Sequence, residues 1–484
     1  MSSTSIIGGS SVIVIILNII RSKVIALLLG PSGTGLISAF QSSTSLLQTL
    51  AGLGINNSAV RDIAQANSKD NQGKLSIVVK SLRKLVLFTG LAGLILTIIF
   101  AQPLSEFTFE TIDYTWEIRL LSIAVFFNLI QAGQSALIQG MRRIKDLARM
   151  SILSSVMGTV LSLPLIYFFE FDGISVYLVA LAIGQFLVSL YYARKIKILD
   201  VKVSWRRAFE ESKGMIKLGS SFMGASLATV LGAYLVRVII IRDLSLTDAG
   251  IYQAAYAISG IYAGVIFQAM GKDFYPRLAG IAFESKKEIQ LINEQTQVGM
   301  VLAAPGLMFT LALAPIGIRL LYSVEYIEAY PVLQWMILGV FLRTIAFPMG
   351  YLFIARAKGK TFLWTEIVTW SLQVGFVFFG LKFFGLKGTG IAFFVLYILY
   401  TTMMFYLLKR ENNFRWTKQV MKTIVILSLL FGLAFTILQF LNQLWGSIIV
   451  CAIGIILTYI AYLEIIKILE MKSLKELIIK LKKS

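Results

Sequence analysis

Long apolar segments separated by short polar ones dominate the hydropathy pattern of this 484-residue chain. The apolar runs are about 20 residues long, which is the length that a helix needs to cross ~30 Å of hydrocarbon. The pattern predicts an all-α polytopic membrane protein with about fourteen transmembrane helices. We place these spans at residues 7–29, 35–59, 85–104, 117–139, 150–170, 174–193, 217–241, 249–271, 296–321, 331–355, 361–381, 389–408, 423–441 and 447–466.

The composition agrees with this class and excludes several kinds of site. Hydrophobic residues make up 57% of the chain and charged residues only 14%, which is too little charge for a soluble domain of this length. The single cysteine, Cys451, rules out an internal disulfide and argues against a structural thiolate metal site. Histidine, the usual ligand of zinc and haem, is absent from the sequence. We therefore expect no metal and no cofactor.

The net charge of +20 reflects the predicted topology. With the N-terminus inside, four of the 45 lysines and arginines fall within spans and five lie in outer loops or at outer span edges: Arg119, Arg242, Arg319, Lys382 and Lys387. All the others lie in inner loops or in the C-terminal tail. Inner loops of membrane proteins carry such an excess of positive charge. The asymmetry predicts that both termini are cytoplasmic and gives no reason to expect a nucleic-acid partner.

The two halves of the chain repeat one another. The turn glycines Gly35 and Gly250 are 215 residues apart, and so are the hairpin glycines Gly173 and Gly388. A constant offset across several landmarks indicates a duplicated six-helix unit. Because six is an even number of spans, the two copies share one orientation, and a cavity is expected between two pseudo-symmetric bundles.

This repeat divides the chain into five predicted regions. They are an N-terminal six-helix lobe (1–193), a cytoplasmic linker (194–216), a C-terminal six-helix lobe (217–410), an extra transmembrane hairpin (411–466) and a basic amphipathic cytoplasmic tail (467–484). The tail is expected to rest on anionic headgroups, so membrane lipids are predicted partners.

Four cations inside predicted spans are the first candidates for a functional site: Arg21, Lys23, Arg237 and Arg343. An arginine at the centre of a span costs ~2.5–3.5 kcal/mol on insertion scales, so each one needs a reason. The first three can also snorkel to the outer interface or pair with an acidic residue there, whereas Arg343 lies too deep for that. A guanidinium binds phosphate by bidentate donation, so these cations predict a seat for a diphosphate in a two-lobed transporter.

Glu366 is the one clear carboxylate within a predicted span. It either carries a coupling proton or neutralises a nearby cation, and the sequence leaves both interpretations open. A phosphate-binding loop, a Gly-rich dinucleotide turn and a metal cluster are all missing from the sequence. These absences favour a transporter over an enzyme.

Several stretches resemble one known family. They are LLGPSGTGLISAF with LAGLGINNSAVRDIAQ in the first half, and GIYQAAYAISGIYAGVIFQAMGKDFYPRLAGI with GYLFIARAKGKTFLWTEI in the second. Together they look like the Wzx-type flippases of lipid-linked oligosaccharides. These flippases, which include the O-antigen and enterobacterial common antigen transporters, belong to the multidrug/oligosaccharidyl-lipid/polysaccharide (MOP) exporter superfamily. The resemblance covers about residues 10–410, and the hairpin after residue 423 departs from it.

The resemblance implies a MATE-like, V-shaped fold in the bacterial cytoplasmic (inner) membrane. The implied substrate is an undecaprenyl-diphosphate-linked glycan of O-antigen or lipopolysaccharide biosynthesis, moved to the outer leaflet by alternating access. An H+ or Na+ gradient would drive the cycle, and the polysaccharide polymerase machinery is an implied partner. Arg21, Lys23, Arg237 and Arg343 would then hold the diphosphate, while Asn128 and Gln131 would contact sugars.

Three alternatives stay open. A multidrug or cation antiporter of the same fold would favour carboxylates in its cavity, whereas this interior is net cationic. A lipid II flippase fits the fourteen spans and the buried cations nearly as well. A membrane glycan polymerase or ligase is an enzyme with a large outer loop, and the predicted outer loops here are short.

Overall fold

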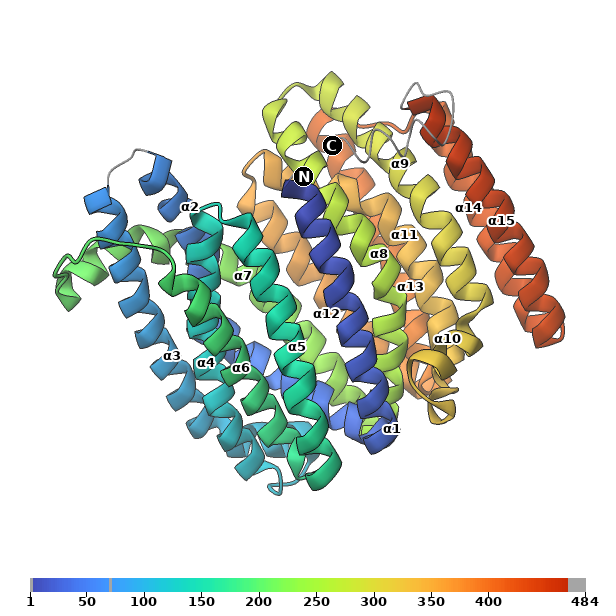
Figure 1. Cartoon of the computed structure of the whole chain (residues 1–484). Coiled ribbons are helices and arrows are strands. Elements are labelled where there is room, and N and C mark those ends of the chain that lie inside the picture. The colour runs from blue at the N-terminus through green and yellow to red at the C-terminus, as the bar shows by residue number, and fades with distance from the viewer. Residues whose placement is uncertain (1–2, 69–71, 469–484) are drawn as a thin grey trace. The chain divides into compact units, whose positions relative to one another are not determined.

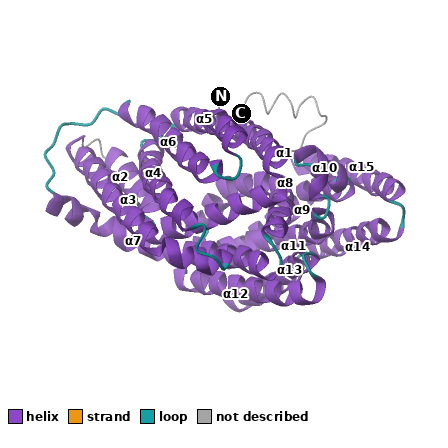
Figure 2. Cartoon of the chain, turned by 90° about the horizontal axis from the view of Figure 1, so that it is seen from below, coloured by secondary structure: helices purple, strands orange, loops and turns teal. Residues whose placement is uncertain are grey.

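The computed structural model describes residues 3–68 and 72–468, and most of them lie in helices (Figure 2). No strand occurs within these ranges. Apolar runs of this length form helices because a helix satisfies all its backbone hydrogen bonds within one segment. The elements are α1 (Ser3–Gly52), α2 (Ile55–Ser68), α3 (Gln72–Phe109), α4 (Thr115–Gly140), α5 (Ile144–Phe169), α6 (Gly173–Arg194), α7 (Trp205–Asp243), α8 (Leu246–Gly280), α9 (Ser285–Ala312), α10 (Ala314–Leu321), the short 3-10 helix η1 (Val324–Tyr326), α11 (Ala329–Ala355), α12 (Gly359–Phe384), α13 (Lys387–Asn412), α14 (Lys418–Phe440) and α15 (Gln443–Ile468).

These helices contain the predicted spans. Among the described residues, twelve helices are long and apolar enough to cross a membrane, and α9 with α10 adds one broken span. One of the twelve, α1, contains the first two predicted spans on either side of a kink at Gly30. The predicted all-α membrane fold is therefore confirmed.

One predicted span boundary was wrong, and one predicted span is bent. The predicted span 35–59 ends at Gly52, because Leu53 and Gly54 adopt left-handed φ values of 49° and 63° that no α-helix can contain. The predicted span 296–321 is not straight, since α9 and α10 meet at a bend of 78°. Pro315 lies in the first turn of α10, where its missing N–H costs no helical hydrogen bond.

The kink in α1 follows from two adjacent residues. Gly30 has φ 60° and ψ −166°, a conformation that glycine reaches at little cost and other residues avoid. Pro31 follows it and has no N–H to give to the preceding helical turn. The two halves of α1 therefore run in different directions (Figure 1).

The chain divides into two compact units, residues 1–250 and 251–483. Helix α7 lies in the first unit and packs against α1, α2 and α3. The hydroxyls of Thr108 and Tyr234 are 2.7 Å apart, and Arg242 of α7 forms an ion pair of 2.7 Å with Glu110. The sequence analysis assigned α7 to the second lobe. The division into two lobes, 1–193 and 217–410, that move as units stays a prediction.

The segment between α6 and α7 is held against α3. Lys80 pairs with Asp200 at 2.5 Å, Lys84 donates to the carbonyl of Val203 at 2.6 Å, and the amide of Leu199 donates to Ser76 at 2.8 Å. The hydrogen bond from Lys80 lowers the pKa of the Asp200 carboxyl. These contacts put the linker at the same end of the first unit as the beginning of α3.

The repeat is visible in the backbone of corresponding turns. Arg143, before α5, has φ −81° and ψ 64°, and Lys358, before α12, has φ −83° and ψ 61°. Glu170 and Gly385, which follow the same two helices, have positive φ values of 48° and 58°. Each pair is separated by the offset of 215 residues that the sequence predicted.

Corresponding residues of the two repeats also touch each other within the first unit. A Cβ on Gly35 would lie 2.0 Å from the carbonyl oxygen of Leu246, and a Cβ on Gly250 would lie 1.9 Å from that of Pro31. Pro31 corresponds to Leu246 and Gly35 to Gly250, so the contact is self-complementary, as across a two-fold axis. Only glycine permits this approach of the two backbones.

A side chain at Gly35 should therefore open this contact. Ser32 and Thr247 face each other across it with their hydroxyls 2.7 Å apart, so cysteines at both positions should form a disulfide on mild oxidation. Adding Gly35→Val should reduce this cross-linking at least about fivefold, because a Cβ has no room there. The experiment uses a Cys451→Ser background, and Gly317→Val, where a Cβ meets nothing within 4 Å, is the control. Equal cross-linking with Gly35→Val would show that the contact is not tight.

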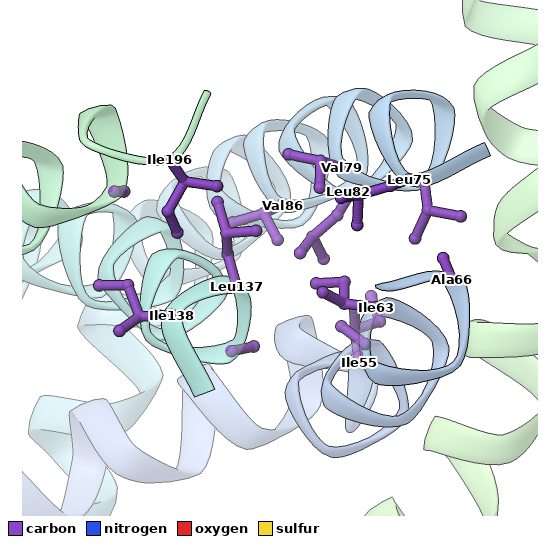
Figure 3. Close-up of a cluster of buried hydrophobic side chains, with 14 of the residues drawn as sticks. Ile55, Ile63, Ala66, Leu75, Val79, Leu82, Val86, Leu137, Ile138 and Ile196 are labelled. Carbon is purple, nitrogen blue, oxygen red and sulfur yellow. The ribbon is translucent and has the colours of Figure 1, made fainter. Parts of the chain in front are cut away.

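An apolar core closes one end of the first unit (Figure 3). It joins α2, α3 and α4 to the residues that follow α6, and includes Ile55, Ile63, Leu75, Val79, Leu82, Leu137, Ile138 and Ile196. Burial of apolar surface contributes ~25 cal/mol of stability per Å². These contacts therefore hold α2 across the ends of the longer helices.

The predicted basic tail, 467–484, lies outside the described residues apart from its first two, which end α15. Its amphipathic character stays a prediction.

Candidate functional site

Arg343 lies near the middle of α11 and is surrounded by aromatic rings of the second unit. Its guanidinium carbon is 5.1 Å from the centre of the Phe267 ring and 5.8 Å from that of Tyr397. Such cation–π contacts stabilise a charge that has lost part of its hydration. The Arg343 guanidinium can thus stay near the middle of its membrane-spanning helix and need not extend to the membrane surface.

Polar groups complete the surroundings of Arg343. Tyr256 of α8, Tyr400 of α13 and Glu366 of α12 all lie within electrostatic range of the guanidinium. The structure therefore brings together two of the residues singled out from sequence, Arg343 and Glu366. We call this set, with Phe267 and Tyr397, the Arg343 cluster. It combines a permanent cation, a titratable carboxylate and phenol hydroxyls that can donate hydrogen bonds to an anion.

Arg21 belongs to the first unit and is directed towards α5. Its Nη2 donates a hydrogen bond of 2.9 Å to Oδ1 of Asn18, one turn earlier in α1, and Ser155 of α5 donates to the same oxygen at 3.4 Å. The absence of a side chain at Gly158 makes room for the guanidinium, since a Cβ there would lie 3.1 Å from Nη1. A neutral amide orients the guanidinium without neutralising it, so Arg21 keeps a charge available for an anion.

The other two candidate cations have different surroundings. Arg237 of α7 donates from Nη1 to the carbonyl of Ala233 on its own helix at 2.8 Å. Lys23 is half-buried in α1 and also makes interactions within the structure. Arg21 and Arg237 thus bond to different partners, on α1 and α7. Their joint binding of one diphosphate stays a prediction.

The two candidate sugar contacts, Asn128 and Gln131, are half-buried on α4. Gln131 donates to Ser135 of the same helix at 3.2 Å. The Asn128 amide makes no hydrogen bond to any other described residue and is not enclosed by its neighbours. Nearby Gln134, by contrast, accepts a hydrogen bond from Ser189 of α6 and joins two helices. Asn128 is the better placed of the two to meet a polar ligand.

The sequence analysis missed a buried ionic network at one end of the second unit. Glu288 of α9 is fully buried and accepts two hydrogen bonds from Arg356, at 2.8 and 2.5 Å. Arg356 also pairs with Glu411 at 2.7 Å, and Asn412 donates to Glu288 at 3.2 Å. We call these residues, with Lys358, the Glu288 network. Its members come from three separate segments of the chain and form no recognisable motif, so no local sequence pattern predicts the network.

The repeat shows that this network has an apolar counterpart. The residues that lie 215 positions before Glu288, Arg356 and Glu411 are Gly73, Met141 and Ile196. Ile196 belongs to the apolar core of the first unit, and Met141 packs against that core. At these corresponding positions the first repeat thus has small or apolar residues, whereas the second has charged residues next to an apolar core of its own.

The comparisons with known proteins agree with this architecture. Residues 1–282 match the protein family described as polysaccharide biosynthesis protein. The chain is 25% identical over 408 residues to the lipid III flippase of Escherichia coli (strain K12), covering 82% of this chain and 95% of that relative.

Two solved structures share the fold. One is the lipid II flippase MurJ in an inward closed conformation, with a TM-score of 0.70, 16% identity, and coverage of 95% of this chain and 98% of that chain. The other is a multidrug resistance MATE family transporter of the MOP superfamily in an inward-facing conformation. Its TM-score is 0.71 at 15% identity, with coverage of 82% of this chain and 94% of that chain. The MATE-like fold expected from the sequence is thereby confirmed.

Proposed function

Because the chain belongs to the polysaccharide biosynthesis protein family, we propose that it is a flippase of lipid-linked oligosaccharides. It moves an undecaprenyl-diphosphate-linked glycan, such as an O-antigen or exopolysaccharide repeat unit, from the cytoplasmic to the periplasmic leaflet. The family match, the name of the lipid III flippase relative and the fold support a transporter rather than an enzyme.

The observation that carries this proposal is the Arg343 cluster. A transporter for cationic drugs would need a net negative site, whereas here a permanent cation lies in a membrane-spanning helix, and among the described residues Glu366 is the one carboxylate in its electrostatic range. A diphosphate brings the negative charge that such a cation requires, and bidentate donation from a guanidinium is well matched to it. In this scheme Arg343 holds the diphosphate, and Arg21, Lys23 and Arg237 contribute charge from the first unit.

The remaining roles belong to the same proposal. Asn128 and Gln131 contact the sugars, for which amide groups are suitable donors and acceptors. The two lobes alternate between inward and outward openings in the inner membrane, with both termini in the cytoplasm. An H+ or Na+ gradient drives the cycle, and the polysaccharide polymerase machinery receives the product.

Glu366 provides a route from proton binding to substrate binding. The ionised carboxylate competes with a diphosphate for the charge of Arg343, and a protonated Glu366 leaves that charge to the substrate. By thermodynamic linkage, the proton and the diphosphate then favour each other's binding. Affinity should therefore rise as the pH falls.

The variant Glu366→Gln tests this coupling. It should bind geranylgeranyl diphosphate at neutral pH about five- to tenfold more tightly than the unmodified protein, since the competing charge is gone. Its affinity should also depend less on pH than that of the unmodified protein. Protonation of the ligand itself affects both proteins equally, so the difference between the two proteins reports on Glu366. Glu294→Gln, the same change at a residue that accepts a hydrogen bond from Gln290, is the control. An unchanged pH dependence in Glu366→Gln would remove this residue from the coupling.

Genetic complementation separates the two flippase functions. The chain is expressed in one bacterial strain that lacks its O-antigen or exopolysaccharide flippase, and in another depleted of its lipid II flippase. Restored surface polysaccharide in the first strain alone is the expected result. Rescue of peptidoglycan synthesis alone would assign the chain to lipid II, and rescue of neither would contradict the proposal.

A further inference from the structure

A small apolar pocket lies between α12 and α13, and none of the functions assigned above uses it. Its volume is about 300 Å³. It is lined by Thr369 and Leu372 of α12 and by Leu396, Leu399, Tyr400, Thr402, Met403 and Tyr406 of α13. Both helices are long and apolar enough to span a membrane, so the pocket faces a hydrocarbon environment.

The polar atoms of the pocket do not offer a site for a polar ligand. The hydroxyl of Thr369 donates to the carbonyl of Thr365 at 2.6 Å, and that of Thr402 donates to the carbonyl of Ile398 at 2.8 Å. Both threonines thus use their hydrogen on their own helix backbone, which is common for this residue within helices. The rest of the lining consists of leucine, methionine and tyrosine side chains. An apolar pocket of this kind accepts hydrocarbon and excludes water.

The pocket adjoins the Arg343 cluster. Tyr400 lines the pocket and also lies within electrostatic range of Arg343 and Glu366. Thr369 is one helical turn after Glu366 on α12, and residues three apart share a helix face. A molecule with a charged head and an apolar tail could therefore place its head at Arg343 and its tail in the pocket.

We propose that this pocket binds the first isoprene units of the polyprenyl chain whose diphosphate is held at Arg343. The inference rests on the proposed function and extends it to the lipid part of the substrate. A dry apolar cavity of ~150 Å³ accepts benzene, so 300 Å³ holds roughly ten carbon atoms, or two isoprene units. The pocket thus takes the part of the chain close to the diphosphate, and the rest of the chain stays in the bilayer.

The test fills the pocket without removing any charge. Leu399 lines the pocket and is 42% exposed, whereas its neighbour Ile398 on α13 is 40% exposed and does not line it. Leu399→Trp and Ile398→Trp therefore add the same ring at matched positions. The probe is a benzophenone derivative of geranylgeranyl diphosphate, photo-cross-linked to the full-length protein in nanodiscs. The sites of labelling are read by mass spectrometry of the peptides from α12 and α13.

We expect labelling of α12 and α13 that unlabelled geranylgeranyl diphosphate displaces and that Leu399→Trp lowers at least about tenfold, because the added ring occupies the pocket. Ile398→Trp should label like the unmodified protein. Labelling that phosphatidylglycerol displaces equally well would show a groove for bilayer lipid and overturn the inference. Equal labelling of the two tryptophan variants would also overturn it.

Transport measurements on the same variants separate this inference from the proposed function. If the unmodified protein and Leu399→Trp both translocate a lipid-linked glycan at the same rate, the function stands and the pocket is not used. If labelling is blocked by Leu399→Trp but the unmodified protein moves no lipid-linked glycan, the pocket binds a polyprenyl chain and the flippase proposal fails.

Discussion

Replacing Arg343 with glutamine is expected to lower the rate of lipid-linked glycan transport at least about thirtyfold, because the loss of a buried charge partner costs about 2–5 kcal/mol of binding. The guanidinium is the charge around which Phe267, Tyr397 and Tyr400 are arranged, and glutamine offers no charge to a diphosphate. Initial rates in proteoliposomes, at equal amounts of inserted protein, are the measurement.

Insertion itself should not suffer in this variant. Removing an arginine from the middle of a span relieves a cost of ~2.5–3.5 kcal/mol, so Arg343→Gln should reach the membrane at least as well as the unmodified protein. Arg319→Gln, which makes the same change in the last turn of α10, is the matched control and should transport normally. Transport by Arg343→Gln at half the normal rate or better would exclude the diphosphate role of Arg343.

The second large effect is expected in the Glu288 network. Glu288→Gln should lower the free energy of unfolding by about 3 kcal/mol, because it leaves the buried Arg356 with less compensation. The exposed side-chain fractions of the two partners are 0% and 5%, so water cannot replace the lost charge. Thermal unfolding of the purified protein, followed by tryptophan fluorescence, should show a midpoint several degrees lower.

A neighbouring ion pair provides the control. Glu284 pairs with Lys287 at 2.7 Å, but both side chains are more than half exposed. Glu284→Gln should therefore change stability by less than about 1 kcal/mol. The double change Glu288→Leu with Arg356→Met should regain most of the lost stability, because apolar residues of similar volume often replace a buried pair without loss. If the two single variants are equally stable, the network does not hold this end of the unit.

The fold could be predicted from sequence because the bilayer imposes one simple rule. Apolar runs of span length must be helical, and each of the fourteen predicted spans is helical over most of its length. The errors occurred where a local conformation interrupts an apolar run. Nothing in hydropathy distinguishes Leu53 from a residue that continues the helix, although its φ of 49° ends α1.

The repeat was also accessible from sequence, because its offset is carried by glycines that the geometry requires. Gly35 and Gly250 are needed because a Cβ at either position would lie 2.0 or 1.9 Å from a carbonyl oxygen of the other segment. The packing of α7 against α1, α2 and α3 was not accessible, since its decisive contacts are Thr108 with Tyr234 and Glu110 with Arg242. These pairs join segments more than a hundred residues apart.

The sequence drew attention to some residues of the candidate site, whose roles stay predictions. A charge within a span is a strong signal, and it identified Arg343 and Glu366, which the structure brings within electrostatic range. The aromatic residues that enclose Arg343 carry no such signal. Phe267 and Tyr397 are two among the many aromatic residues of the chain, and only the packing of α8 and α13 against α11 selects them.

The central claim is tested most directly by measuring how much of the glycan is exposed at each leaflet of the membrane. Purified protein is reconstituted into liposomes that contain an undecaprenyl-diphosphate-linked oligosaccharide, and a glycan-cleaving enzyme outside reports how much sugar is accessible. We predict a protein-dependent increase in accessible sugar over time that Arg343→Gln abolishes and Arg319→Gln preserves. No movement of any lipid-linked glycan, together with efflux of a small cationic dye, would contradict the account and make the chain a drug exporter.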